Sequence, residues 1–165
     1  MHLKFIDLYD RYFDDIYRYT YFKTGNKWET DDLVSEIFTK AYENFSSAKG
    51  SYKAWLFTIA RNAITDHYRK KKEVVLGDDM DLYTYPHTFE EDLEKDEELK
   101  CLKSSLKMLS GDELEIISLR YFSDMKYGDI GKVLGKSEDA VKMKAFRTIK
   151  KLKTLVNNLV VSKVL

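Results

Sequence analysis

Apolar residues in this chain recur at intervals of three and four positions, and this spacing is the feature that most restricts its fold. Three segments show it in the first half, at residues 5–22, 31–45 and 51–72. A helix that buries one face has this spacing, whereas a half-buried strand alternates every second residue. No segment alternates in that way over a useful length. The sequence therefore predicts an all-α protein that begins with an aromatic-rich three-helix domain, whose second helix is capped by Thr30 or Asp31.

Charged residues are segregated along the chain, although the formal net charge is zero. Residues 49–72 hold seven basic residues and one acidic residue, residues 73–100 hold eleven acidic and two basic, and residues 125–165 hold ten basic and three acidic. This order indicates two polyanion-binding modules and a solvated connector; the alternative is that the charges only keep the surface wet. We assign residues 1–72 to the three-helix domain, 73–92 to an acidic linker, and 93–165 to a second helical domain.

The segment 126–155 has the pattern of a helix-turn-helix. A short helix is followed by Gly135, Lys136 and Ser137, and the Ser137 hydroxyl can cap a long second helix. Apolar residues fall where two crossed helices would bury them, at Ile130, Val133, Leu134, Val141, Ala145, Ile149 and Leu152. The second helix keeps many lysines and arginines for its outer face, so it can lie in the major groove of DNA. The alternative is an ordinary helical hairpin with a solvated charged face.

Leucines upstream of this segment predict the rest of the second domain. Leu93, Leu99, Leu102, Leu106 and Leu109 have helical spacing, and the single cysteine, Cys101, lies among them as an expected buried thiol. After Ser110, Gly111 and Asp112, another short helix is indicated by Leu114, Ile117, Tyr121 and Phe122.

Signatures of catalysis and metal binding are missing from the sequence. It has neither a P-loop nor a dinucleotide fingerprint, and its three histidines are scattered. One cysteine allows neither an intrachain disulfide nor a Cys-based metal site. We therefore expect no enzyme activity, no metal and no cofactor. The N-terminus lacks the apolar core of a signal peptide and no run approaches membrane-spanning length, so we expect a cytoplasmic protein without membrane insertion.

The third helical segment offers groups that can contact nucleic acid. Opposite its apolar face it presents polar residues spaced by three or four, namely Thr58, Arg61, Asn62, Thr65, Asp66 and Arg69, and it ends in three lysines. Asn and Thr can bond to base edges, and Arg and Lys can bind phosphates. Phe45, Tyr52 and Trp55, near its start, can stack on unpaired bases. The alternative is a solvated helix face whose basic last turn complements the helix dipole.

The second helical segment carries an acidic front. Glu29, Asp31, Asp32 and Glu36 lie around Ser35 near its start. The helix dipole favours carboxylates there in any case. In a nucleic-acid-binding domain such a patch repels phosphate, so it is also a candidate surface for a protein partner.

These residues together resemble a known family. The sequences DLVSE at 32–36, SYKAWLFTIARN at 51–62 and DHYR at 66–69 look like region 2 of extracytoplasmic-function (ECF) sigma factors. The sequences YGDIG at 127–131, LGKS at 134–137 and AVK at 140–142 resemble region 4 of the same family. The resemblance covers nearly the whole chain, and the acidic segment lies where the family has its linker.

The resemblance implies a role for three sets of residues. Asp32, Ser35 and Glu36 would contact the clamp helices of the RNA polymerase β′ subunit, and the core enzyme's β subunit is a further expected partner. The −10 promoter element would be recognised and opened by Phe45, Tyr52, Arg61, Asn62, Thr65, Asp66 and Arg69. The −35 element would be read by Ser137, Glu138, Asp139, Lys142, Met143, Lys144, Phe146 and Arg147.

The chain departs from the family pattern at two places. Ser35 replaces the glutamine that is common in the polymerase-contact motif. Met143, Lys144 and Phe146 stand where the family often has smaller or more basic residues. The family's promoter preference is therefore not carried over to this chain.

The implied function is that of an ECF-type sigma factor, which recruits core polymerase, recognises both promoter elements and helps to open the start site without itself being a catalyst. An anti-sigma factor is the regulatory partner that the resemblance implies. The main alternative is a helix-turn-helix regulator that binds duplex DNA without sigma activity. A more distant one is an interaction module whose basic faces bind an acidic protein.

Overall fold

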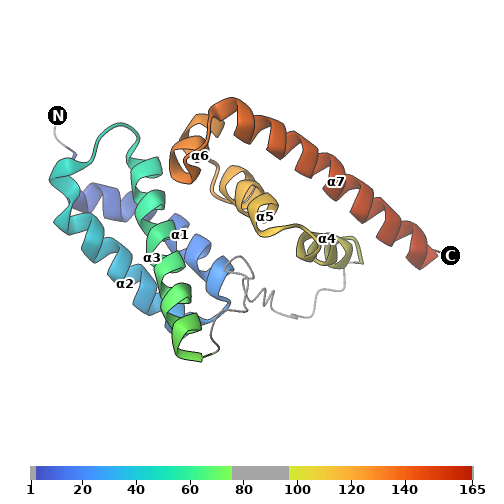
Figure 1. Cartoon of the computed structure of the whole chain (residues 1–165), viewed down its shortest axis with the longest axis horizontal. Helices are drawn as coiled ribbons and strands as arrows, with labels where there is room; N and C mark the ends of the chain where they lie inside the picture. The colour runs from blue at the N-terminus through green and yellow to red at the C-terminus, as the bar shows by residue number, and fades with distance from the viewer. Residues whose placement is uncertain (1–2, 76–96, 165) are drawn as a thin grey trace.

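The computed structural model describes residues 3–75 and 97–164, and the regular elements in these ranges are helical (Figure 1). The first half contains α1 (Phe5–Thr24), α2 (Lys27–Glu43), the single 3₁₀ turn η1 (Phe45–Ser47) and α3 (Tyr52–Val75). The second contains α4 (Glu97–Lys107), α5 (Gly111–Ile117), the π-helical turn η3 (Ser118–Phe122), α6 (Tyr127–Leu134) and α7 (Glu138–Val164). The predicted all-α class is confirmed. Helix α3 extends three residues into the range predicted as linker; residues 76–92 and Leu93 lie outside the described residues.

Helices α1, α2 and α3 pack on one another around a core of aliphatic and aromatic side chains. Leu8 and Ile16 of α1, Ile37 of α2, and Leu56 and Phe57 of α3 are fully buried. A fully buried side chain of this size stabilises the fold by about 1.5–3 kcal/mol. Around this core, rings of α1 and α2 meet edge to face or stacked along the seam between the two helices.

Helix α2 begins earlier than the sequence analysis predicted. Its N-cap is Asn26, whose side-chain oxygen accepts hydrogen bonds from the backbone N–H groups of Trp28 and Glu29 at 2.8 and 3.1 Å. The prediction of Thr30 or Asp31 as the cap was therefore wrong. Thr30 instead lies inside the helix, fully buried, and its hydroxyl is 2.7 Å from that of Thr24. The helix begins after Asn26 because Asn can cap a helix as well as Thr or Asp can, and no residue between Asn26 and Asp31 interrupts the helix.

The second half has its own smaller core between α4, α5 and α7. Leu106, Leu109, Leu114 and Ile117 are buried there, and Cys101 is buried as predicted. Tyr121 and Phe122, which marked the predicted short helix, follow α5 in η3 but are mostly exposed.

The two halves share a buried interface. Ile116, Leu119, Met125, Ile130 and Val133 of the second half belong to the same buried cluster as the core of α1–α3. Helix α6 packs directly on α3, and the two lie side by side in Figure 1.

In the described part of the chain, none of the helices combines the length and apolarity needed to cross a membrane.

Candidate nucleic-acid and polymerase interfaces

The predicted helix-turn-helix is formed by α6, a short turn and α7. Gly135 ends α6 with φ 67°, in the left-handed region that glycine adopts without strain. The Ser137 hydroxyl accepts a hydrogen bond from the Ala140 N–H at 3.2 Å, so the predicted cap is confirmed. Gly131 lies where the turn crosses α6: a Cβ there would be 2.5 Å from the Lys136 carbonyl oxygen. The turn is thus fixed by two glycines and one serine.

The predicted −35 residues lie on the outer side of α7 and in its cap. Ser137, Glu138, Asp139, Lys142, Met143, Phe146 and Arg147 are exposed, and Lys144 is half-buried. The Lys142 ammonium is 5.9 Å from the centre of the Phe146 ring, which also meets Tyr127 edge to face. Lys144 forms an ion pair with Asp112 at 3.5 Å. The exposed end of α7 therefore combines acidic, basic and apolar groups, which can contact bases and phosphates alike.

The predicted −10 residues divide into an exposed set and one that is turned inward. Asn62, Thr65 and Arg69 are exposed on α3, and Arg69 pairs with Asp66 at 2.7 Å. Arg61 points instead toward the second half of the molecule, where its Nε lies 3.5 Å from a carboxylate oxygen of Glu115. In this conformation the Arg61 side chain therefore does not lie on the exposed face of α3.

Aromatic rings gather where the chain turns from α2 into α3. Phe45 of η1 lies 6.0 Å from Tyr52 and 6.4 Å from Trp55, between ring centroids. All three rings are half-buried. They form a partly accessible stacking surface next to the first turn of α3.

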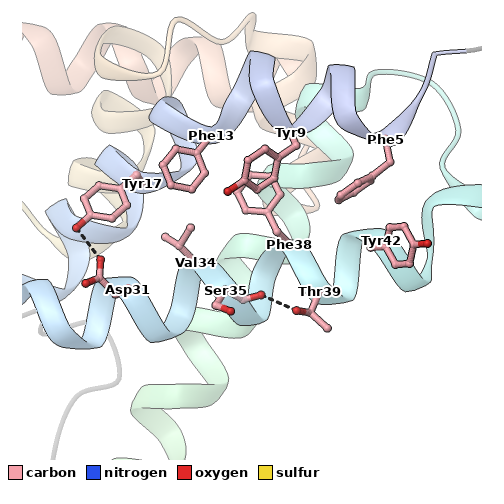
Figure 2. Close-up of a pocket in the computed structure, with 10 residues that line it drawn as sticks. All are labelled: Phe5, Tyr9, Phe13, Tyr17, Asp31, Val34, Ser35, Phe38, Thr39 and Tyr42. Carbon is pink, nitrogen blue, oxygen red and sulfur yellow. Dashed lines mark hydrogen bonds between the residues drawn. The ribbon is translucent and has the colours of Figure 1, made fainter.

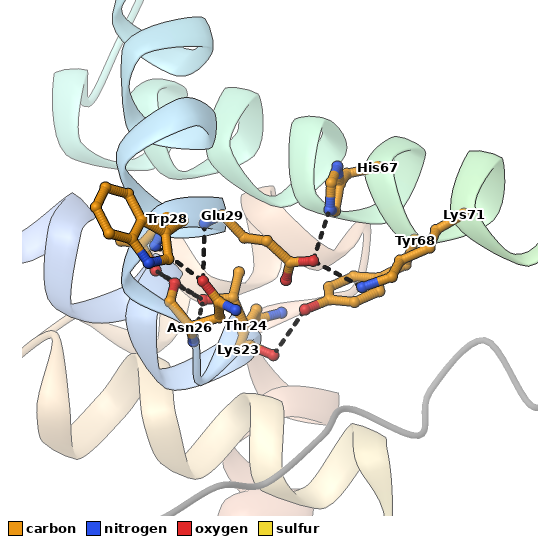
Figure 3. Close-up of polar contacts among 9 residues, drawn as sticks. Lys23, Thr24, Asn26, Trp28, Glu29, His67, Tyr68 and Lys71 are labelled. Carbon is orange, nitrogen blue, oxygen red and sulfur yellow. Dashed lines mark hydrogen bonds and ion pairs between the residues drawn. The ribbon is translucent and has the colours of Figure 1, made fainter.

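The predicted polymerase-contact residues lie together on α2. Asp32, Ser35 and Glu36 are exposed, and Glu36 pairs with Lys40 one turn further on at 2.7 Å. Glu29, which the sequence placed in the same acidic front, points toward α3 (Figure 3): its carboxylate lies 2.6 Å from Lys71 and 3.9 Å from His67, both on α3. The free acidic surface of α2 is therefore centred on Asp32 and Glu36.

An open aromatic groove runs along the seam of α1 and α2, beside this acidic surface (Figure 2). It is lined by Phe5, Tyr9, Phe13 and Tyr17 of α1, and by Asp31, Val34, Ser35, Phe38, Thr39 and Tyr42 of α2. At one end the Tyr17 hydroxyl donates a hydrogen bond to Asp31 at 2.9 Å. This bond raises the pKa of Tyr17 above its ordinary value because the ionised phenol could no longer donate it; partial desolvation and repulsion by the Asp31 carboxylate act in the same direction. Helical spacing alone predicts only that such aromatic residues lie on the buried faces of the two helices.

Two residues at the boundary between the halves were not identified from the sequence. Lys23 of α1 is 1% exposed and Glu115 of α5 is 6% exposed, and they form an ion pair with each other. They are 92 positions apart, and each belongs to a residue type that usually lies on the surface, so no local pattern marks them.

In the described residues there is no cluster of three or more metal-ligating side chains.

Comparison with known proteins identifies the class. The models of Sigma-70 region 2 and Sigma-70 region 4 match residues 8–74 and 99–152. The ECF sigma factor SigM of Bacillus subtilis is 31% identical over 153 residues, which cover 92% of this chain and 94% of SigM. The ECF sigma factor BldN of Streptomyces coelicolor is 30% identical over 155 residues, and the match spans 90% of this chain but only 59% of BldN. The two matched models define a sigma-70 type transcription initiation factor.

The chain belongs to the ECF group of sigma factors. Solved structures agree with this: it is similar to the sigma factor RpoE from Bartonella quintana, solved in complex with the anti-sigma factor NepR, with 25% identity and a TM-score of 0.73 over 93% of this chain and 96% of RpoE. CnrH, solved with the cytosolic domain of CnrY, has the same fold, with 24% identity and a TM-score of 0.66 over 93% of this chain and 88% of CnrH. A simple duplex-binding regulator would not account for the match to region 2.

Proposed function

We propose that this protein recruits core RNA polymerase to a set of promoters, recognises their −10 and −35 elements and helps to open the start site. One observation carries the proposal: within the matched regions 2 and 4, a single chain exposes a polar face of α3, an outer face of α7 and, apart from both, an acidic face of α2. A factor that links polymerase to DNA needs one surface for protein and two for promoter DNA.

The acidic face of α2 is the proposed contact with polymerase. Asp32 and Glu36 lie one helical turn apart on the same exposed side, with Ser35 between them. Two carboxylates in this position repel DNA and attract a basic surface, which we assign to the β′ clamp helices. Ser35 offers a short hydroxyl for this contact. The second half of the chain is the proposed partner of the β subunit.

The exposed face of α3 is the proposed reader of single-stranded −10 DNA. The amide of Asn62 and the hydroxyl of Thr65 can bond to the edges of exposed bases, while Arg69 binds phosphate and is oriented by Asp66. Phe45 and Tyr52 are the proposed stacking partners of a base that has left the duplex. Each such contact is worth about 1–3 kcal/mol. Strand opening then follows from binding the unpaired form of the DNA more tightly than the paired form.

The N-terminal part of α7 is the proposed reader of the −35 element. Recognition helices usually insert that end into the major groove, which brings Glu138, Asp139 and Lys142 to the base edges. Met143 and Phe146 offer apolar contact beside them, and Arg147 lies further along, where phosphate contacts are expected.

In this proposal the polymerase performs all the chemistry. This chain acts in the cytoplasm only by binding. Its proposed regulatory partner is an anti-sigma factor. Support comes from RpoE, which has a similar structure and was solved with the anti-sigma factor NepR.

Core-enzyme binding tests the proposal directly. The wild-type protein should co-purify with core polymerase and direct factor-dependent run-off transcription. The double variant Asp32→Lys/Glu36→Lys should keep its helix content but lose binding to core enzyme, because exposed substitutions change folding by about 0.5 kcal/mol or less. Asp10→Lys/Asp14→Lys, which changes the charge equally at two exposed sites one helical turn apart on α1, is the control and should bind normally.

Two outcomes would reject the proposal. A protein that binds duplex promoter DNA tightly without core enzyme, and gives no transcription with it, is a simple regulator. Undiminished core binding by the folded Asp32→Lys/Glu36→Lys variant would remove the assignment of the α2 surface.

A further inference from the structure

The outer face of α7 carries an apolar pair among its charged groups. Met143 and Phe146 are 59% and 58% exposed, although both side chains are large and apolar. Met143 lies directly opposite the buried row that contains Val141 and Ala145, because successive residues of an α-helix are about 100° apart. Phe146, three residues further on, lies beside Met143 on the same face. Single exposed apolar residues are common on protein surfaces, so exposure alone assigns no role to the pair.

The ring of Phe146 is held in place by its neighbours. It meets Tyr127 of α6 edge to face, with 6.4 Å between the ring centroids, and the Lys142 ammonium lies 5.9 Å from its centre. Tyr127 is itself covered by the Arg120 guanidinium, 4.3 Å from the centre of the ring. Arg120 in turn donates a hydrogen bond to the Met125 carbonyl at 3.0 Å. The exposed ring is therefore oriented before any partner binds, which lowers the entropy cost of using it for recognition.

The major groove of DNA offers one apolar group that such a pair can recognise. Base edges there present hydrogen-bond donors and acceptors, and thymine adds the methyl group on C5. Neither a phenyl ring nor a thioether can replace the hydrogen bonds that water makes to a phosphate. A side chain of this kind on the reading face of α7 therefore matches a thymine methyl group better than it matches the backbone.

The spacing of the pair matches neighbouring base pairs. Three residues of an α-helix span about 4.5 Å along its axis. Successive base pairs of B-form DNA are about 3.4 Å apart. Met143 and Phe146 can therefore each meet one of two neighbouring base pairs.

We propose that Met143 and Phe146 are specificity-determining residues, which contact the methyl groups of thymines in two neighbouring base pairs of the −35 element. The inference rests on the proposed function and deepens it by naming the chemical group that α7 recognises. Both positions are among those at which the chain departs from the family pattern, so this preference belongs to the chain itself.

The first experiment identifies the thymines. Promoters with a randomised −35 element are selected for binding by the full-length protein assembled with core enzyme, and thymine is expected in two neighbouring base pairs of the selected element. Each thymine is then replaced singly by deoxyuridine, which lacks the methyl group but keeps every hydrogen-bonding group of the base. The wild type should bind about fourfold more weakly for each of the two contacted thymines, because one buried methyl group is lost each time.

Substitutions then assign each methyl group to a side chain. Phe146→Ala should bind the thymine and uracil forms equally at one of the two positions, and Met143→Ala should do so at the other. Phe146→Leu keeps an apolar group and should retain a uracil effect. Ile6→Ala, which removes an equally exposed apolar side chain from α1, is the matched control and should retain both effects in full. The readout is the ratio of thymine to uracil binding, which a general loss of stability leaves unchanged.

Specific results would overturn the inference. A selected element without thymine, equal binding of the thymine and uracil forms by the wild type, or a full uracil effect in both Phe146→Ala and Met143→Ala would each reject it. Variants that bind core enzyme more weakly while they keep the uracil effect would also reject it, because the pair would then contact protein.

The proposed function can fail separately. If the protein directs no transcription with core enzyme, the selection and the uracil substitutions are carried out on duplex DNA with the full-length protein alone. A uracil effect that depends on Met143 and Phe146 would then support the recognition of thymine by a duplex-binding regulator, while the sigma role fails. The absence of any uracil effect would reject the recognition of thymine as well.

Discussion

Replacing Gly131 with alanine should destabilise the helix-turn-helix, although alanine is the better helix former. A Cβ at Gly131 would meet the Lys136 carbonyl oxygen at 2.5 Å, and real Cβ contacts under 3.0 Å essentially never occur. The turn would have to retreat by at least about half an ångström, which strains the 2.9 Å hydrogen bond from the Lys136 N–H to the Gly131 carbonyl. Overpacking of this kind typically costs about 1–3 kcal/mol, against a gain of up to about 1 kcal/mol in helix propensity.

Gly128 in the same helix provides the matched control. Its added Cβ would meet only the Glu138 carboxylate at 3.4 Å, and that group ends a flexible side chain. Gly128→Ala should therefore be neutral or stabilising, and the two variants should differ in unfolding free energy by about 1–3 kcal/mol. Thermal unfolding followed by circular dichroism should show Gly131→Ala melting lower, by about 2–4 °C for each kcal/mol in a chain of this size. Equal melting temperatures for the two variants would refute the close approach.

Four further substitutions test the interfaces and the cap of α2. Asn62→Ala should reduce strand opening, measured by permanganate footprinting, while core-enzyme binding persists; unchanged opening would make Asn62 a plain surface residue. Lys142→Ala should change which −35 sequences are selected, with a loss of discrimination of about 1–3 kcal/mol. Arg147→Ala should instead weaken binding to all sequences alike and lower the salt slope by about 1. Selection from a −35 library with both variants checks this division between base and phosphate contacts. An exchange of the two effects would contradict it. Asn26→Ala should cost about 1 kcal/mol in urea unfolding because α2 loses two capped N–H groups; no loss would mean that water caps the helix equally well.

Local signals predicted the second half well. The turn at Gly135 and the cap at Ser137 depend on backbone conformation and on a hydrogen bond three residues away, so a short stretch of sequence contains all the necessary information. The start of α2 was misplaced because Asn26, Thr30 and Asp31 are all chemically able to cap a helix. Choosing among them requires knowing that Thr30 is buried against Thr24.

Contacts between distant segments could not be predicted in this way. Periodicity assigns aromatic residues such as Tyr9 and Phe38 to the buried faces of α1 and α2, but it does not show that the seam between the helices stays open as a groove. Nor does it distinguish Lys23 or Glu115 from the many charged residues that are solvated. Arg61 was grouped with Asn62 by helical spacing, yet the neighbouring domain draws it to the other side. Each miss depends on how segments that are distant in the sequence pack together.

Helix α7 joins two tasks in one continuous rod. Its first turns belong to the helix-turn-helix, and it packs on α4 along the same unbroken helix, which runs from Glu138 to Val164. Its 27 residues make a rod about 40 Å long at 1.5 Å per residue. A tilt of about 10° around the α4 contact would therefore sweep the opposite end sideways by several ångströms, comparable to the spacing of adjacent base pairs. If α7 reads the −35 element as proposed, a change in the seating of α4 would therefore alter the register at which α7 meets DNA.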